Sequence, residues 1–152
     1  MSSEAVFAVE SYAQLVDEIK PLLPEHWAEL AVHKDIPLDP DFGFYERAAA
    51  TGSLIFMTVR EAGALIGYAI WVVKPHPHYR KHIWALNDIV WLHPEHRGMS
   101  LGKNLVKFWE TELRARNVAV IHVDTKLVAP QLLYLLQNTG YETTGVAVEK
   151  RL

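Results

Sequence analysis

The residues best suited to chemistry lie between Asp88 and Lys103, where an apolar stretch runs into a glycine-containing turn. Helical spacing follows the turn, so this segment predicts a strand, a turn and the start of a helix. The first amides of a helix lack intrahelical partners, and the helix dipole adds partial positive charge there. Gly98, Ser100 and Gly102 are small enough to let phosphates approach the backbone. The segment therefore predicts a pyrophosphate site, the alternative being that the glycines only form a tight turn.

Asp88 is the candidate general base, because it lies on the apolar strand that leads into this turn. Between Leu86 and Leu92, only Asn87 and Asp88 have side chains suited to such work, apart from the indole of Trp91. Burial would raise the pKa of Asp88 and make it a stronger base. The alternative is a hydrogen-bonded carboxylate with a structural role.

The segment 74–82 contains three histidines, two lysines and one arginine, together with two prolines that predict a loop. Its charge suits a substrate-recognition edge for an acidic or carboxylate-bearing amine, although a basic solvated loop explains the composition equally well. The spacing of the three histidines fits no standard zinc motif, so no metal site is predicted. The candidate substrate contacts are His76, His78, Tyr79 and Arg80.

Composition and missing motifs exclude several classes of protein. The 152 residues contain no cysteine, which excludes disulfide scaffolds, thiolate metal sites and cysteine nucleophiles. Neither the P-loop pattern nor the dinucleotide-binding pattern GxGxxG is present. A net charge of -3 disfavours nucleic-acid binding. Because no apolar run reaches about 18 residues and no secretory signal is visible, we expect a cytoplasmic protein with no membrane partner.

The hydrophobic periodicity predicts a mixed α/β or α+β domain spanning residues 1–152. Ser11 is expected to cap the first helix, and Pro24 to lie in the first turn of the second. The segment 118–123 is apolar except for His122, which predicts a central strand buried on both faces. Helices are predicted over 12–20, 24–31, 42–50, 101–116 and 129–138, and strands over 54–59, 64–73, 83–92, 118–123 and 141–148.

The segment 93–102 resembles the acetyl-CoA-binding motif of the GCN5-related N-acetyltransferases, the GNAT family. In the family pattern (Q/R)xxGx(G/A), Arg97 takes the first position and Gly102 the last, while Ser100 replaces the usual central glycine. The order of elements also resembles the family over residues 5–150, especially its small bacterial and phage-associated members. The resemblance implies one acyl-CoA N-acyltransferase domain with a mixed, mostly antiparallel central sheet. Helices would flank this sheet, which would splay between the fourth and fifth strands of the family fold, here the predicted strands over 83–92 and 118–123.

The resemblance also implies how the ligands bind. Acetyl-CoA would be the cosubstrate, with its pantetheine in the splay and its pyrophosphate on the backbone of the turn. The N-terminal region, with His26, Trp27 and Tyr45, would form one wall of the acceptor cleft. Leu136 replaces the tyrosine that acts as general acid in many members, and Tyr134, expected to point elsewhere, is a weaker candidate acid. The candidate cofactor-binding residues are Val90, Trp91, Leu92, Arg97, Gly98, Met99, Ser100, Leu101, Gly102 and Lys103.

These features predict an N-acetyltransferase that moves the acetyl group directly to a primary amine in a ternary complex, because no cysteine can form an acyl-enzyme. The acceptor would be a small-molecule or peptide amine, and the resemblance allows a homodimer. One alternative is a non-catalytic CoA-binding sensor or interaction module. Another is a protein that binds a different ligand and uses the glycines only to turn the chain.

Overall fold

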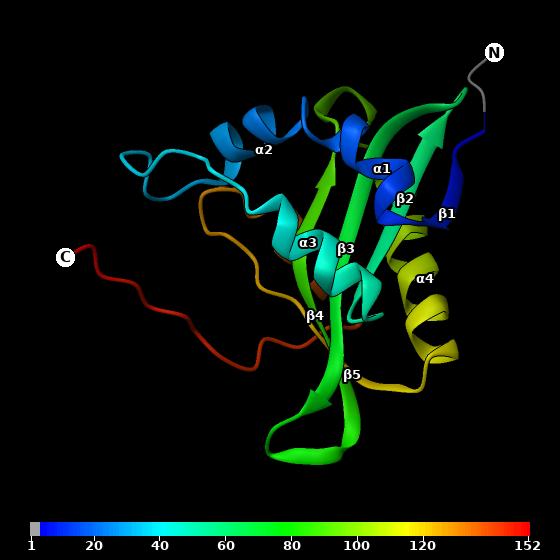
Figure 1. Ribbon diagram of the computed structural model, residues 1–152, viewed down its shortest axis with the longest axis vertical. Helices are drawn as coiled ribbons and strands as arrows, with labels where there is room; N and C mark the ends of the chain where they lie inside the picture. The colour runs from blue at the N-terminus through cyan, green and yellow to red at the C-terminus, as the bar shows by residue number, and fades with distance from the viewer. Residues whose placement is uncertain (1–3) are drawn as a thin grey trace.

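The computed structural model describes residues 4–152, apart from the side chain of Met99, and contains a five-stranded sheet flanked by helices (Figure 1). The strands lie in chain order, with antiparallel pairing from the first to the fourth and parallel pairing between the fourth and fifth. This confirms the predicted mixed, mostly antiparallel sheet. The strands are β1 (Val6–Glu10), β2 (Leu54–Glu61), β3 (Ala64–His76), β4 (Tyr79–Leu92) and β5 (Val118–His122).

Local signals in the sequence explain where the helices begin. The Ser11 side chain accepts a hydrogen bond from the Gln14 amide, and the Gln14 side chain accepts one from the Ser11 amide, which confirms the predicted cap. Pro24 lies in the first turn of its helix, as expected. No helix within residues 4–152 is long and apolar enough to cross a membrane. The helices are α1 (Tyr12–Ile19), α2 (Leu23–Leu30), α3 (Phe42–Ala50), α4 (Met99–Ala115) and α5 (Gln131–Gln137).

Alternation along the central strands divides the core between the two faces of the sheet. On one face, Phe56 and Tyr68 pack with side chains of α1, α2 and α3. On the other face, Met57 and Trp71 pack beneath α4, where the Trp71 ring centroid lies 5.2 Å from that of Trp109. Figure 1 shows α1 and α3 on the opposite side of the sheet from α4. Helices therefore cover both faces of the sheet.

The predicted loop over 74–82 is wrong, because β3 continues to His76 and β4 begins at Tyr79. Ring packing stabilises this extension, with the His76 ring of β3 4.2 Å from the Trp84 ring of β4 and the Tyr79 ring 5.9 Å from Trp84 along β4, between centroids. A register shift next to Pro75 accommodates the missing amide. In Figure 1 the hairpin projects beyond the rest of the sheet.

The C-terminal half departs from the sequence prediction at two further places. The segment 141–148 forms no strand, and Val146 and Val148 are 89% and 91% exposed. The tail adds no strand to the sheet and instead contacts the segment after α2, where Arg151 pairs with Asp35 and Glu149 hydrogen-bonds with His33. As a result β5 is the last strand of the sheet, with Val120 exposed, and is not buried on both faces. Strand β1 was not predicted, because its five residues are too few to show a clear alternation.

Close packing between β3 and β4 requires glycine at position 67. A Cβ atom there would overlap the Leu92 side chain and lie 2.9 Å from the Trp91 carbonyl oxygen. We expect Gly67→Ala to lower the free energy of unfolding by about 1–3 kcal/mol, because β4 must shift. Thermal unfolding measures this loss as a drop in Tm of several degrees. Gly145→Ala is the control, since its Cβ would meet open space; equal melting of both variants would contradict the packing described.

Candidate functional site

The parallel pairing of β4 with β5 ends at Leu86 and His122. At the next position the Asn87 side chain binds the backbone of Asp124, with Nδ2 donating to the carbonyl oxygen at 3.1 Å and Oδ1 accepting from the amide at 2.7 Å. These two hydrogen bonds take the place of one more pair of backbone hydrogen bonds between β4 and β5. Beyond Asn87 the two chains separate. The predicted splay between the fourth and fifth strands is therefore confirmed.

A cleft of about 860 Å³ lies where these strands separate. Its walls come from the end of β4, the turn that follows, the first turns of α4, and α5. Within the part of the chain that the structure describes, no strand pairs with residues 88–92 on the side facing the cleft. This leaves a strand edge whose peptide groups can bind an amide-containing ligand. Of the predicted cofactor residues, those that line the cleft are Val90, Trp91, Leu92, Arg97, Gly98, Gly102 and Lys103.

The N-terminus of α4 is built to leave backbone amides accessible. A short 3₁₀ turn (Pro94–His96) leads into Gly98, which is the N-cap and provides no capping side chain. A Cβ at Gly98 would meet no atom within 4 Å, so the space beside it is open. Gly102 has a different role, since a Cβ there would lie 3.0 Å from the Leu135 side chain of α5. Together with Lys103, this end of the helix presents positive potential to the cleft.

Not every residue of the predicted phosphate turn faces the cleft. Ser100 is exposed on the first turn of α4, and Leu101 packs toward the core beneath that helix. Neither residue lines the cleft. The side chain of Met99 lies outside the described part of the structure. The backbone of this turn, more than its side chains, is therefore what meets a ligand.

Arg97 connects the turn to helix α2. Its two terminal nitrogens donate to the two carboxylate oxygens of Glu29, each at 2.6 Å, and its Nε donates to the Leu92 carbonyl at 2.8 Å. The hydrogen bonds from Arg97 lower the pKa of Glu29. The Arg97 amide itself donates to the Pro94 carbonyl. Arg97 therefore fixes the shape of the turn, and the amides available to a ligand begin at Gly98.

Asp88 forms a hydrogen-bonded pair with Tyr45 of α3, whose hydroxyl donates to Oδ2 at 2.7 Å. Asp88 faces the cleft and stays accessible to solvent, yet protein surrounds it on the remaining sides. This partial desolvation raises the pKa of Asp88, while the Tyr45 hydrogen bond opposes the rise. The arrangement gives a carboxylate that can accept a proton from a ligand in the cleft. The sequence did not predict the pairing, because 43 positions separate the two residues.

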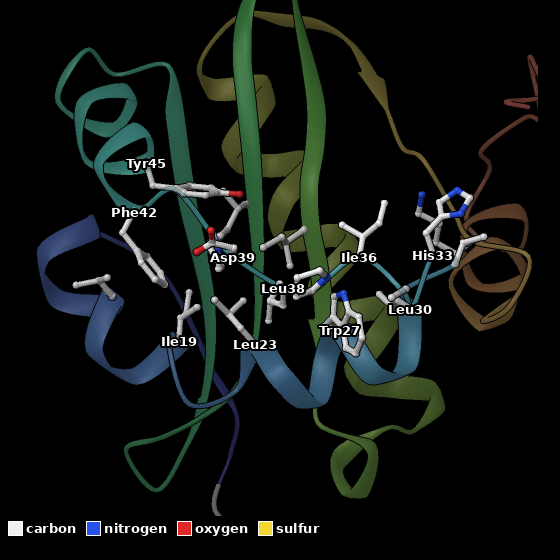
Figure 2. Close-up of a pocket in the computed structure, with 18 of the residues that line it drawn as sticks. Ile19, Leu23, Trp27, Leu30, His33, Ile36, Leu38, Asp39, Phe42 and Tyr45 are labelled. Carbon is white, nitrogen blue, oxygen red and sulfur yellow. The ribbon is translucent and has the colours of Figure 1, made fainter. Parts of the chain in front are cut away.

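A second cavity, of about 520 Å³, lies between the sheet and the helices of the N-terminal region (Figure 2). Its walls are mainly apolar and include Trp27 and Tyr45. Leu30, Ile89 and Lys126 line both this cavity and the cleft, so the two adjoin each other. The Tyr45–Asp88 pair joins them, because Tyr45 lines the cavity and Asp88 the cleft.

Tyr134 and Leu136 point in different directions from α5. Leu136 is only 3% exposed and belongs to the core, whereas Tyr134 is 59% exposed and lines the cleft. Tyr134 therefore points elsewhere than position 136, as expected for a residue two positions away along a helix, and the cleft lies on the side that it faces. This places a phenol hydroxyl in the same cleft as Asp88.

The tip of the hairpin between β3 and β4 lies away from both the cleft and the second cavity. His76, His78, Tyr79 and Arg80 line neither of them, because the extended strands carry them beyond the sheet. Their contacts are local, including the His78 amide donating to His76 Nδ1 at 3.1 Å. Within residues 4–152, no group of three or more histidine or acidic side chains is placed to hold a metal ion.

Buried His26 lines the cleft from α2. Its ring stacks on Trp91 at 5.9 Å between centroids, and its Nδ1 lies 3.2 Å from the Tyr68 hydroxyl. Burial lowers its pKa to about 4, so the ring is neutral near pH 7. The expected wall from the N-terminal region is present, but its members divide: His26 faces the cleft, whereas Trp27 and Tyr45 face the second cavity.

Comparisons with known proteins agree with this geometry. A sequence profile of the Acetyltransferase (GNAT) family matches residues 13–137. No curated protein is detectably similar in sequence to this chain. Among solved structures, a ribosomal-protein-alanine N-acetyltransferase from Brucella melitensis biovar Abortus 2308 superposes with a TM-score of 0.74 at 17% identity, covering 98% of this chain and 99% of that one.

Two further structures were determined with the cosubstrate or its product. A predicted acetyltransferase from Clostridium acetobutylicum with acetyl-CoA has a TM-score of 0.72 at 12% identity, covering 97% of this chain and 96% of that one. An aminoglycoside N-acetyltransferase in complex with CoA has a TM-score of 0.75 at 15% identity, covering 100% and 96%. Because the family profile spans most of the sequence, the chain belongs to the GNAT family of acetyltransferases and is an acyltransferase.

Proposed function

We propose that this protein transfers an acetyl group from acetyl-CoA directly to a primary amine bound in the second cavity. The observation that carries the proposal is the Tyr45–Asp88 pair at the junction of the cleft and that cavity. A base at this position can take the proton of an amine that enters from one side while the thioester lies on the other. The names of similar structures include acetyltransferases of aminoglycosides and of glucosamine-6-phosphate, which supports an amine acceptor.

The residues of the cleft fit acetyl-CoA by chemistry and by shape. The uncapped start of α4, with open space at Gly98, suits the pyrophosphate, and the strand edge at residues 88–92 suits the amides of pantetheine. Acetyl-CoA supplies the thioester, whose C–S bond breaks as the amine nitrogen forms the new C–N bond. Asp88 accepts the proton lost by the amine. Tyr134 lines the same cleft and donates a proton to the departing thiolate.

We further infer that residues 1–152 act as one domain, since the sheet and both cores use segments from most of the chain. The cytoplasmic location and the homodimer stay predictions.

Binding of acetyl-CoA is tested by thermal unfolding. At 100 times its Kd, acetyl-CoA should stabilise the protein by about 2.7 kcal/mol, which raises Tm by several degrees. Gly98→Val should melt normally without ligand, because its Cβ has open space, and should lose this shift as the side chain fills the phosphate position. ATP and inorganic phosphate are the ligand controls and Gly145→Val the variant control. An undiminished shift in Gly98→Val would remove the turn as the pyrophosphate site.

The role of Asp88 is tested by replacing its carboxylate with a neutral amide. We expect Asp88→Asn to lower kcat/KM at least about 100-fold, because general base catalysis contributes on that order, and to retain the acetyl-CoA-dependent rise in Tm. Thiol release with an accepted amine measures the rate. Unchanged turnover would exclude Asp88 as base, whereas wild-type binding without turnover for any amine would favour a non-catalytic CoA-binding module.

The pH dependence of turnover tests the Tyr45–Asp88 pair. Only the deprotonated carboxylate accepts a proton, so kcat/KM should fall as the pH drops through the raised pKa of Asp88. The Tyr45 hydrogen bond lowers that pKa, so Tyr45→Phe should move the acidic limb of the profile to higher pH. An unmoved limb, measured over the pH range in which the variant stays folded, would contradict this assignment.

A further inference from the structure

We propose that the natural acceptor is a primary amine attached to a bulky apolar group, such as an aryl or branched alkyl group. This rests on the proposed function and concerns the second cavity, of which the sequence analysis had named Trp27 and Tyr45 as wall residues. A cavity of about 520 Å³ holds a group of that size.

The walls of the cavity are suited to apolar matter. α1, α2, the loop after α2, α3 and the sheet contribute aromatic and aliphatic side chains, and Figure 2 shows several of them pointing into the same space. Burying such surface against a ligand is favourable in proportion to the apolar area covered. The residues most important to this proposal are Leu23, Trp27, Ile36, Leu38, Phe42 and Ile89.

Several polar side chains of the wall already have partners. The Tyr12 hydroxyl donates to the Phe42 carbonyl at 3.0 Å, and the Tyr45 hydroxyl donates to Asp88. His33 lies 2.9 Å from the carboxylate of Glu149. A hydroxyl-rich acceptor would find few hydrogen-bonding groups here to replace those it loses in water, and unpaired buried hydroxyls are costly. The wall therefore discriminates against sugar-like amines.

The acidic side chains near the cavity favour an acceptor whose apolar group carries an ammonium group. Asp39 lines the cavity and Asp88 the adjoining cleft, while the cation Lys126, which lines both spaces, pairs with Glu149 at 4.0 Å. An ammonium group reaches its neutral, nucleophilic form by losing a proton to Asp88. An apolar group in the cavity would then hold the nitrogen at the junction with the cleft.

The segment between α2 and α3 gives a site for mutation that spares the fold. Ile36 and Leu38 line the cavity yet are 45% and 39% exposed, so they add little to the core of the folded protein. A bound apolar group would cover them. We therefore expect Ile36 and Leu38 to contribute to acceptor binding more than to folding stability. A polar replacement should weaken acceptor binding without unfolding the chain.

The test compares amines in the thiol-release assay with acetyl-CoA. We expect kcat/KM for 4-phenylbutylamine to exceed that for glucosamine by at least about tenfold, because apolar burial separates the two. Equal or faster turnover of glucosamine would overturn the inference and leave the proposed acetyl transfer standing. No turnover of either amine, together with no acetyl-CoA-dependent rise in Tm, would overturn the proposed function itself.

A variant pair connects the preference to this cavity. Leu38→Asn should raise KM for 4-phenylbutylamine about tenfold at an unchanged Tm, since the ligand loses a leucine contact. Leu127→Asn is the control, because Leu127 is 89% exposed and lines neither cavity, and its KM should equal that of the wild type. An equal KM in both variants would show that the apolar group binds elsewhere.

Discussion

The site depends on one constraint, the point at which β4 and β5 stop pairing. A parallel ladder that continued would fill the space where the cleft lies, and a ladder that ended without a substitute would leave backbone groups without partners. The Asn87 side chain makes two hydrogen bonds to the backbone of Asp124, so these peptide groups keep partners where the ladder ends. Beyond Asn87 the two chains diverge and leave room for the cleft. The next residue, Asp88, lines the cleft.

Strand β4 borders both the cleft and the second cavity, because a strand has two faces and two edges. Its edge beyond Asn87 borders the cleft, while Ile89 also lines the apolar cavity on the face covered by the N-terminal helices. Tyr45 reaches Asp88 from α3 and so joins the cavity to the cleft. The close approach of β3 at Gly67 keeps the end of β4 in place. The proposed acetyl transfer would therefore take place where the cleft and the cavity adjoin.

Local sequence signals predicted the fold best at helix starts, where the determining hydrogen bonds and backbone angles involve residues close together in the sequence. Ser11 capped its helix, Pro24 opened one, and the glycine-containing turn led into α4, as expected. Long-range contacts were beyond prediction. Nothing local distinguishes 141–148, rich in β-branched residues, from a strand, whereas the contacts of the tail that follows are with residues 116 positions away, after α2. Likewise the pairs Tyr45–Asp88 and Glu29–Arg97 join residues 43 and 68 positions apart.

The bridge between Glu29 and Arg97 has a thermodynamic consequence. Helix α2 provides Trp27 to the apolar cavity, and the same helix is tied by two hydrogen bonds to the turn at the start of α4. This contact is a physical route by which a ligand that displaced α2 in the cavity would act on the turn that borders the cleft. Such a linkage is reciprocal: whatever factor the cosubstrate applies to the affinity for the acceptor, the acceptor applies to the affinity for the cosubstrate.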